Sequence, residues 1–287
     1  MRFFNNWIEE LRIYHWTKNI VIFFPLIAVQ EYSIQSFSTL ISIFLLFSFF
    51  VSGTYIINDI FDLKSDALHK VKKLRPIPSK RINVTNAILV SIFLLSVCLV
   101  ICYYKFSFDI VLIFLIYLIL SLIYSKIIKK IPILDILVLS LFYLIRLWLG
   151  GLAIDVSISV WLFTFCFFIF LPLCCIKRIV EINKFNKKSI RGYDKSDISF
   201  LNNISNSSSL LSLIVILLYA ESTNFKVYYN NIYFLFMISL IIIFWMLRVN
   251  RLANKNLVSH DPVLFALKDK LTYLLTFIVG ILFIINS

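Results

Sequence analysis

Directly after the apolar run Phe37–Ile57, the chain reads Asn58-Asp59-Ile60-Phe61-Asp62-Leu63-Lys64-Ser65-Asp66. The apolar run has the length of a membrane-crossing helix, which needs roughly 20 mainly apolar residues. The polar stretch continues from the end of that helix, at the boundary between membrane and water. This junction predicts a membrane protein with functional groups at the membrane surface.

Oxygen-bearing side chains recur in this stretch at helical spacing. At 3.6 residues per turn, Asn58, Asp62 and Asp66 stack on one face, and Asp59 lies one step round. Such groups repel each other unless a cation lies among them, and Mg²⁺ favours carboxylates combined with substrate phosphates. The spacing therefore predicts a Mg²⁺ site formed by these four residues. The alternative is a solvated helix end whose acids pair with nearby lysines, namely Lys64, Lys70 and Lys72.

The composition of the whole chain agrees with a membrane protein. Of its 287 residues, 61% are hydrophobic and 15% are charged, and the mean hydropathy is +0.92. Soluble domains carry about 45–50% apolar and about 25% charged residues, so a soluble enzyme, a disordered protein and a secreted disulfide scaffold are excluded. The cysteines lie in apolar runs and the histidines lie far apart, which argues against a zinc site. We expect an all-α polytopic membrane protein that forms a single domain over residues 1–287.

Nine apolar runs are candidates for membrane helices, although Pro25 interrupts the first. They are Asn19–Gln35, Phe37–Ile57, Val84–Tyr104, Phe108–Tyr124, Ile131–Gly150, Ser157–Ile176, Ser208–Ala220, Tyr228–Leu247 and Leu271–Ile285.

The basic residues between these runs fall mainly on one side of the membrane. Of 28 Lys and Arg residues, 25 lie on the side of the N-terminus, Lys105 and Lys226 lie on the other, and Arg146 lies inside the fifth run. Because basic residues concentrate on the cytoplasmic side, we expect the N-terminus in the cytoplasm and the C-terminus outside.

Basic side chains follow the acidic stretch. They are His69, Lys70, Lys72, Lys73, Arg75, Lys80 and Arg81. By themselves they fit cytoplasmic charge or contacts with anionic lipid. Beside a metal site they predict ligands for phosphate oxygens, of which arginine can bind two at once. Pro76 fixes the backbone next to Arg75 and so directs that side chain.

A second polar group lies at the cytoplasmic end of the sixth predicted helix. Lys177 and Glu181 share a helix face beside Arg178, and a surface ion pair and a substrate site are equally good interpretations. Farther along the same loop, Asp194 and Asp197 follow Tyr193. They predict either a second metal-binding pair or a polar turn.

Two further cations lie within or next to the apolar runs. Lys18 opens the first run together with Asn19, and Arg146 lies inside the fifth. A cation buried in a membrane helix is costly, so Arg146 is a functional candidate by default. Its alternative role is to pair with Asp135 or with a backbone carbonyl.

Taken together, these residues resemble the UbiA superfamily of intramembrane prenyltransferases, and within it the decaprenyl-phosphate phosphoribosyltransferase branch. The resemblance extends from about Leu11 to about Leu275. Its marks are Trp16-Thr17-Lys18-Asn19, Asn58-Asp59 with Asp62 and Asp66, His69 with Lys72, Arg75-Pro76-Ile77, Tyr143-Leu144-Ile145-Arg146 leading to Gly150-Gly151, Lys177-Arg178 with Glu181, Tyr193 and Asp269. The chain departs from the family at three positions. Ile13 stands where the family usually has proline, His15 where it often has glutamine, and Lys70 where it has proline.

The resemblance implies a UbiA-like bundle of nine helices with cytoplasmic active-site loops in the bacterial inner membrane. It also implies transfer of 5-phosphoribosyl from phosphoribosyl diphosphate (PRPP) to a polyprenyl phosphate, releasing diphosphate, with Mg²⁺ as cofactor. The implied catalytic residues are Lys18, Asp62, Asp66 and Arg75. The implied substrate-binding residues are Lys18, Asp59, Lys72, Arg75, Arg146, Lys177, Arg178, Glu181 and Tyr193.

Two other activities are compatible with parts of the pattern. Asp194 and Asp197 lie where true prenyltransferases of this superfamily carry a second aspartate-rich motif, so the donor could be a prenyl diphosphate and the acceptor an aromatic compound. An anion transporter would also need buried cations, but here the charges crowd one side instead of meeting at the midplane. The expected partners are PRPP, polyprenyl phosphate and the bilayer, with no nucleic acid and with a homo-oligomer left open.

Overall fold

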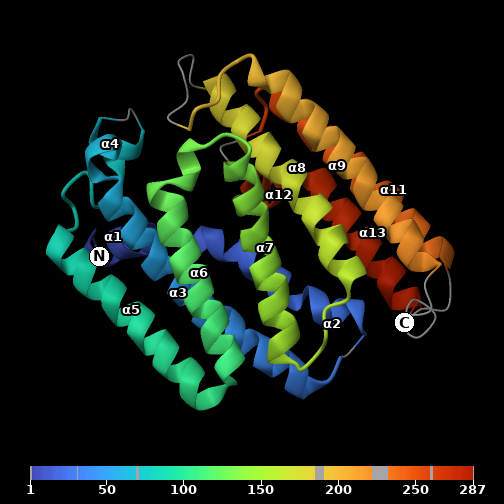
Figure 1. Ribbon diagram of the computed structural model, residues 1–287, viewed down its shortest axis with the longest axis horizontal. Helices are drawn as coiled ribbons and strands as arrows, with labels where there is room; N and C mark the ends of the chain where they lie inside the picture. Colours follow the sequence, from blue (N-terminus) through green and yellow to red (C-terminus); the bar gives the residue numbers. More distant parts are fainter. Residues whose placement is uncertain are drawn as a thin grey trace. The chain divides into compact units, whose positions relative to one another are not determined.

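Helices make up all the regular structure in the described part of the chain, residues 2–30, 32–68, 71–184, 191–221, 232–258 and 261–286 of the computed structural model (Figure 1). The predicted all-α fold is therefore confirmed. The predicted phosphate ligands His69 and Lys70, and residues 228–231 of the eighth predicted span, lie outside these ranges.

Seven helices in the described ranges are long and apolar enough to cross a membrane. They are α3 (Ile34–Phe61), α5 (Val84–Lys105), α6 (Phe108–Lys126), α7 (Leu134–Ala153), α8 (Val160–Lys184), α9 (Asp197–Ala220) and α11 (Ile232–Asn254). Helix α13 (Lys270–Asn286) is apolar but shorter. These eight helices correspond to eight of the predicted spans, and the count of nine is not confirmed.

The remaining predicted span, Asn19–Gln35, is not one continuous helix. Its residues belong to a 3₁₀-helix, η1 (Ile13–Phe23), and to the five-residue helix α2 (Phe24–Ala28). The amide of Phe24 donates to the carbonyl of Val21, three residues back, which is 3₁₀ geometry. Pro25 has no amide hydrogen and its ring opposes an α-helical turn before it, so an α-helix is disfavoured in the residues that precede it.

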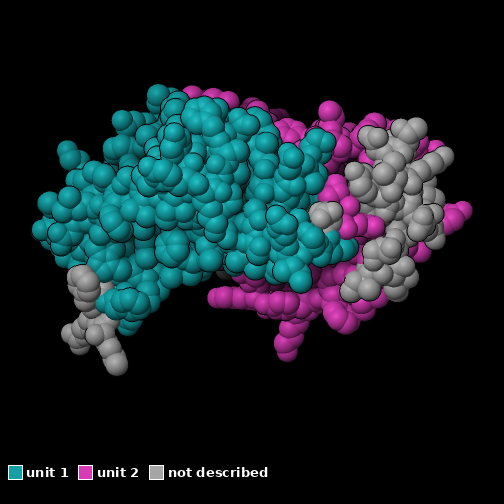
Figure 2. Space-filling model, turned by 90° about the horizontal axis from the view of Figure 1, so that it is seen from below, with its two compact units in different colours: residues 1–26, 32–129, 145–157 teal, residues 27–31, 130–144, 158–287 magenta. Residues whose placement is uncertain are grey.

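The other short elements are α1 (Arg2–Leu11), α4 (Leu63–Ala67), η2 (Lys72–Leu74), η3 (Ile128–Lys130) and α12 (Pro262–Ala266). The chain forms two compact units, coloured separately in Figure 2. Unit 1 comprises residues 1–26, 32–129 and 145–157, and unit 2 comprises residues 27–31, 130–144 and 158–287. The single domain expected from the sequence stays a prediction.

Helix α3 is the centre of unit 1, where it packs against α1, η1, α5 and α6. Phe47 and Phe50 on this helix contact Phe114 of α6 at ring-centroid distances of 5.3 and 4.8 Å. Gly53 allows α5 to approach closely, because a Cβ there would lie 3.1 Å from the Leu95 side chain. This packing holds the C-terminal end of α3 in place, and that end carries the acidic stretch.

Gly150 lets α7 lie directly on the backbone of η1. A Cβ at this position would lie 2.0 Å from the carbonyl oxygen of Ile22, a distance that the rigid backbone cannot relieve cheaply. We therefore expect Gly150→Ala to destabilise the purified protein by about 2 kcal/mol or more, seen as a lower Tm in detergent. The matched control is Gly280→Ala, where a Cβ meets nothing within 4 Å and the Tm should not fall. A Gly150→Ala protein as stable as the wild type would contradict this close approach.

Unit 2 is built around α8, which packs against α9 and α11, while α11 also contacts α13. Helix α9 begins at Asp197, although the sequence predicted a span only from Ser208. The polar residues before Ser208 remain helical because they bind asparagines of α11. Asn202 and Asn254 exchange side-chain hydrogen bonds of 3.1 and 2.8 Å, and Asn250 donates to Asn206 at 2.9 Å.

Candidate active site

The acidic stretch keeps its helical spacing beyond the end of α3. Asp62 caps α3, and α4 begins at the next residue. The amide of Asp62 donates to Asn58 at 2.9 Å, and the amide of Asp66 donates to Asp62 at 2.8 Å. These bonds span four residues each, so the predicted alignment of Asn58, Asp62 and Asp66 is maintained across the junction of the two helices.

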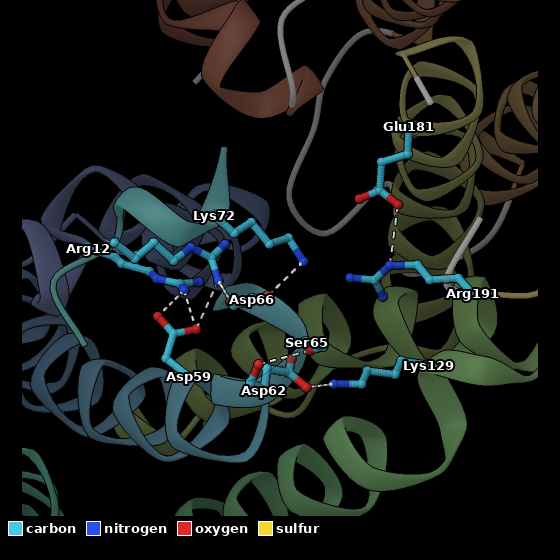
Figure 3. A network of polar contacts seen from close by, with 10 residues as sticks. Arg12, Asp59, Asp62, Ser65, Asp66, Lys72, Lys129, Glu181 and Arg191 are labelled. Atoms are coloured by element: carbon cyan, nitrogen blue, oxygen red, sulfur yellow. Dashed lines mark hydrogen bonds and ion pairs between the residues drawn. The ribbon is translucent and has the colours of Figure 1, made fainter. Parts of the chain in front are cut away.

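Asp59 is buried and is held by two arginines (Figure 3). Both of its carboxylate oxygens accept hydrogen bonds from Nη2 of Arg12, and Oδ1 also accepts from Nη1 of Arg75 at 3.1 Å. Burial opposes the charge on Arg12, but the Asp59 carboxylate outweighs it and raises the pKa of the guanidinium. Asp59 is thus neutralised within unit 1.

Arg75 connects Asp59 to Asp66. Its Nη1 donates to Oδ2 of the buried Asp66 at 2.6 Å, while Nζ of Lys72 lies 3.4 Å from the other oxygen (Figure 3). The backbone at Arg75 is extended, with φ −62° and ψ 154°, as expected for a residue that precedes proline. Proline therefore helps to aim this side chain, as the sequence predicted.

Asp62 has a different cation. Nζ of Lys129, in the segment after α6, lies 2.5 Å from its Oδ1 (Figure 3). Lys129 is 12% exposed and Asp62 is 21% exposed, so this pair lies at the edge of the cluster. All three aspartates of the stretch are consequently neutralised by basic side chains.

The donor chemistry of the stretch suits Mg²⁺. Asn58, Asp62 and Asp66 offer only oxygen ligands, and Mg²⁺ needs only one or two carboxylates if substrate phosphates supply the rest. The carboxylates do not converge on one point: within the described ranges no group of three His, Cys, Asp or Glu side chains could hold a metal. The residues therefore fit a metal that arrives with a phosphorylated substrate, because a preformed protein cage is not needed for it.

Arg146, predicted to bind a substrate, is buried inside unit 1. Its Nε donates to Oδ1 of Asn19 at 2.7 Å, and its Nη2 donates to the hydroxyl of Tyr117 at 3.3 Å. The guanidinium also lies 5.4 Å from the ring centroid of Phe47. Lys18, the neighbour of Asn19, is half-buried in η1. Asn19, in contrast to Lys18, is fully buried, and it orients Arg146 by accepting the hydrogen bond from its Nε.

A second ionic cluster lies in unit 2, at the end of α8. Arg178 is buried and donates to both carboxylate oxygens of Asp135, at 2.5 and 2.9 Å, and to Glu181 at 2.5 Å. Arg191 lies 3.6 Å from Asp135 and 3.3 Å from Glu181. Asp135, proposed from the sequence as a partner for Arg146, is therefore an ion-pair partner of Arg178.

The loop of unit 2 that precedes α9 is fixed by its own side chains. The hydroxyl of Tyr193 accepts a hydrogen bond from the amide of Ile133 at 2.8 Å, and burial raises its pKa to about 12. Asp194 accepts hydrogen bonds from the amide and hydroxyl of Ser196, and Asp197 accepts from the amide of Asp194. Of the two interpretations that the sequence left open for this aspartate pair, these contacts favour the polar turn. Lys177, in α8, is half-buried.

Sequence reasoning missed four charged residues that complete these clusters. Arg12, Lys129 and Arg191 were counted only as cytoplasmic basic residues, and Glu10 was not considered. Glu10 is 1% exposed, yet neither of its carboxylate oxygens has a hydrogen-bond partner among the described residues. No periodic signal marks such contacts, because Arg12 and Lys129 lie 47 and 67 residues from their aspartates.

Comparison of the sequence with models of known protein families identifies the family to which this helical protein belongs. The model of the UbiA prenyltransferase family matches residues 19–285. The chain belongs to the UbiA prenyltransferase family. Together with its seven apolar helices, this membership makes the protein an integral membrane protein of an enzyme family.

Individual UbiA-family relatives differ in what their names say. Uncharacterized protein y4nM of Sinorhizobium fredii is 30% identical over 97% of this chain and 55% of its own length, so the chain spans about half of that relative. Nodulation protein NoeC of Azorhizobium caulinodans is 25% identical over 98% of this chain and 94% of its own length. Decaprenyl-phosphate phosphoribosyltransferase of Mycolicibacterium smegmatis is 28% identical over 68% of this chain and 64% of its own length.

The fold of the UbiA family is also found in solved structures. A UbiA homolog from Archaeoglobus fulgidus, solved bound to GPP and Mg²⁺, has a TM-score of 0.69 and 20% sequence identity, covering 96% of this chain and 99% of its own. The predicted UbiA-like bundle is thereby confirmed as the fold.

Proposed function

We propose that this UbiA-family protein transfers the 5-phosphoribosyl group of PRPP to a polyprenyl phosphate and releases diphosphate, for cell-envelope or surface polysaccharide synthesis. The observation that carries the proposal is the engagement of Asp194 and Asp197 in the turn before α9. A prenyl diphosphate donor would call for a second aspartate motif in this loop, and here both aspartates stabilise a turn. The similarity to decaprenyl-phosphate phosphoribosyltransferases supports the same choice.

The reaction exchanges one bond at the anomeric carbon of the ribose. The bond from this carbon to the diphosphate oxygen breaks, the sugar acquires oxocarbenium character, and an oxygen of the acceptor phosphate forms the new bond. The acceptor phosphate is already anionic near neutral pH, so no strong general base is needed. Stabilisation of the departing diphosphate is the main catalytic task.

The unit 1 cluster supplies that stabilisation. Asn58, Asp62 and Asp66 would hold Mg²⁺, with Asp59 beside them, and the bound metal would neutralise charge on the diphosphate. Three cations remain for the phosphate oxygens: Arg75, Lys72 and Lys18. Arg75 and Lys72 both pair with Asp66, so they are positioned beside the proposed metal ligands.

The other residues that the sequence predicted as substrate contacts are divided by the proposal into two that bind phosphate and three that hold the structure around it. Arg146, fixed by Asn19 and Tyr117, would bind the acceptor phosphate. Lys177 would bind the 5-phosphate of the donor. Arg178, Glu181 and Tyr193 would support that group by holding the end of α8 and its loop in shape. We further propose that the protein lies in a bacterial inner membrane with its N-terminus in the cytoplasm and its C-terminus outside.

The proposal is tested by incubating purified protein with labelled PRPP, a polyprenyl phosphate and Mg²⁺. We expect label to enter the lipid phase, and we expect chelation of divalent metal to stop the transfer. A parallel incubation contains a labelled prenyl diphosphate and an aromatic acceptor. Product in the second incubation and none in the first would replace our proposal with a prenyltransferase activity.

The control for this assay is the double variant Asp194→Asn and Asp197→Asn. If these residues only form the turn before α9, the variant should keep at least about a third of the wild-type transfer from PRPP, because each lost turn contact stabilises by about 1 kcal/mol or less. A loss of about 10³-fold in a folded variant would show that the aspartates bind metal.

A further inference from the structure

Glu10 is a buried charged group that the proposed mechanism does not use. It lies near the C-terminal end of α1, is 1% exposed, and has no hydrogen-bond partner for either oxygen among the described residues. Its neighbour Glu9 is exposed and accepts hydrogen bonds from both terminal nitrogens of Arg81, at 2.8 and 3.0 Å. Two adjacent glutamates therefore have opposite surroundings: the described residues supply donors to Glu9 and none to Glu10.

The charged groups that act on Glu10 include members of the ionic cluster around Asp59. Besides burial, which raises the pKa of its carboxyl to about 7, they are Asp59, Arg12, Arg75 and Glu9. Arg12 and Arg75 could satisfy a carboxylate, but both donate to Asp59 instead. Glu10 therefore lies beside the site with its acceptor capacity unused.

Leaving such a group without a donor is unfavourable. A buried carboxyl without a partner loses the hydrogen bonds that water gave it, and nothing compensates for that loss. Glutamine or an apolar residue would avoid much of this cost if Glu10 only filled space in unit 1. A ligand that brings hydrogen-bond donors to this point would recover it.

The surroundings of Glu10 restrict which chemical group of a ligand could bind its carboxyl. A hydroxyl can donate to the Glu10 carboxyl whether that group is ionised or neutral, whereas an ionised carboxylate would repel a phosphate oxygen. Two free acceptor oxygens on one carboxyl match two neighbouring hydroxyls on one sugar. The ribose of PRPP carries such a pair next to the carbon that bears the diphosphate, whereas a prenyl diphosphate carries no hydroxyl.

We propose that Glu10 is a specificity-determining residue whose carboxyl accepts hydrogen bonds from the ribose hydroxyls of the donor. This inference rests on the proposed function, since it assumes that the diphosphate binds at the Asp62–Asp66 end of α3. Arg75 is 30% exposed, and in this proposal it would turn from the aspartates toward the diphosphate and so give the ribose access to Glu10.

The test compares two probes, PRPP and inorganic diphosphate, each with Mg²⁺, in binding to the purified full chain. For Glu10→Gln we expect the Kd of PRPP to rise about 10- to 100-fold, because hydrogen bonds to a charged acceptor are lost. The Kd of inorganic diphosphate should stay within about twofold. The matched control, Glu9→Gln, should leave both values unchanged. Equal weakening of both probes, or no weakening of either, would overturn the role of Glu10.

A second measurement uses the 2-deoxyribose analogue of PRPP. Wild-type protein should bind this analogue about tenfold or more weakly than PRPP, and Glu10→Gln should bind the two compounds nearly equally. The wild-type comparison needs no variant, so it can overturn the inference even if Glu10→Gln does not fold. Equal binding of both compounds by the wild type would count against the inference.

The same measurements separate this inference from the proposed function. Wild-type protein that transfers from PRPP but shows no effect of Glu10→Gln would refute only the role of Glu10. Wild-type protein that binds a prenyl diphosphate and fails to bind PRPP would refute the proposed function and this inference with it.

Discussion

Replacing Asp62 by asparagine is expected to lower kcat/KM for lipid-linked phosphoribose formation by about 10³-fold. The substitution keeps the size of the side chain and one oxygen but removes the negative charge that Mg²⁺ would bind, and such electrostatic contributions are worth about 10²–10³ or more in rate. A loss of this size corresponds to about 4 kcal/mol of transition-state stabilisation. It is measured as label transferred from PRPP to the lipid phase at saturating acceptor.

The control for Asp62→Asn is Asp109→Asn, which removes one negative charge from the exposed start of α6. This variant should keep wild-type activity. Asp62 is paired with Lys129 at the edge of its cluster, so its replacement should leave the Tm nearly unchanged, and the loss of activity can be separated from unfolding. Asp62→Asn with more than about a tenth of wild-type activity would remove this residue from the metal site.

Replacing Arg178 by methionine is expected to destabilise the protein by about 3–5 kcal/mol, the range for breaking a buried ion pair from one side. Asp135 is 0% exposed and receives two hydrogen bonds from Arg178, so the substitution leaves its charge inside unit 2. The Arg191 guanidinium, 3.6 Å away, is too distant to replace those bonds. The expected result is a Tm in detergent lower by roughly 10 °C.

The double variant Arg178→Met and Asp135→Asn separates structure from function at this position. It removes both charges, so it should regain a large part of the stability lost in Arg178→Met, and a double-mutant cycle gives the coupling between the two residues. Arg178→Met with an unchanged Tm but a raised KM for PRPP would instead support the direct substrate contact predicted from the sequence.

The acidic stretch was predictable because its chemistry is local. Asn58, Asp62 and Asp66 are spaced by four residues, and that spacing alone indicates a shared helix face. The role of Pro76 beside Arg75 was likewise a property of neighbouring residues. Helix type was readable for the same reason, since most of the apolar runs have the length of a membrane-crossing helix.

The partners of these residues were not predictable, because they depend on how distant helices pack. Nothing in the sequence indicates that Arg12 approaches Asp59, or that Asp135 pairs with Arg178 and not with Arg146. The one available signal for Asp135 was its place in an apolar span, since a charge there needs a partner. The break at Pro25 was visible in the sequence, but the 3₁₀ geometry of η1 was not.

The pairing of every aspartate in the acidic stretch with a basic side chain has a consequence for turnover. A cluster of unpaired carboxylates would bind a divalent ion tightly and would hold the metal–diphosphate product after the reaction. In this protein, Lys129, Arg75 and Lys72 bind the same oxygens, so under the proposed function they would compete with Mg²⁺ for the aspartates. Such competition would favour release of the metal–diphosphate product and so limit its inhibition of the proposed reaction.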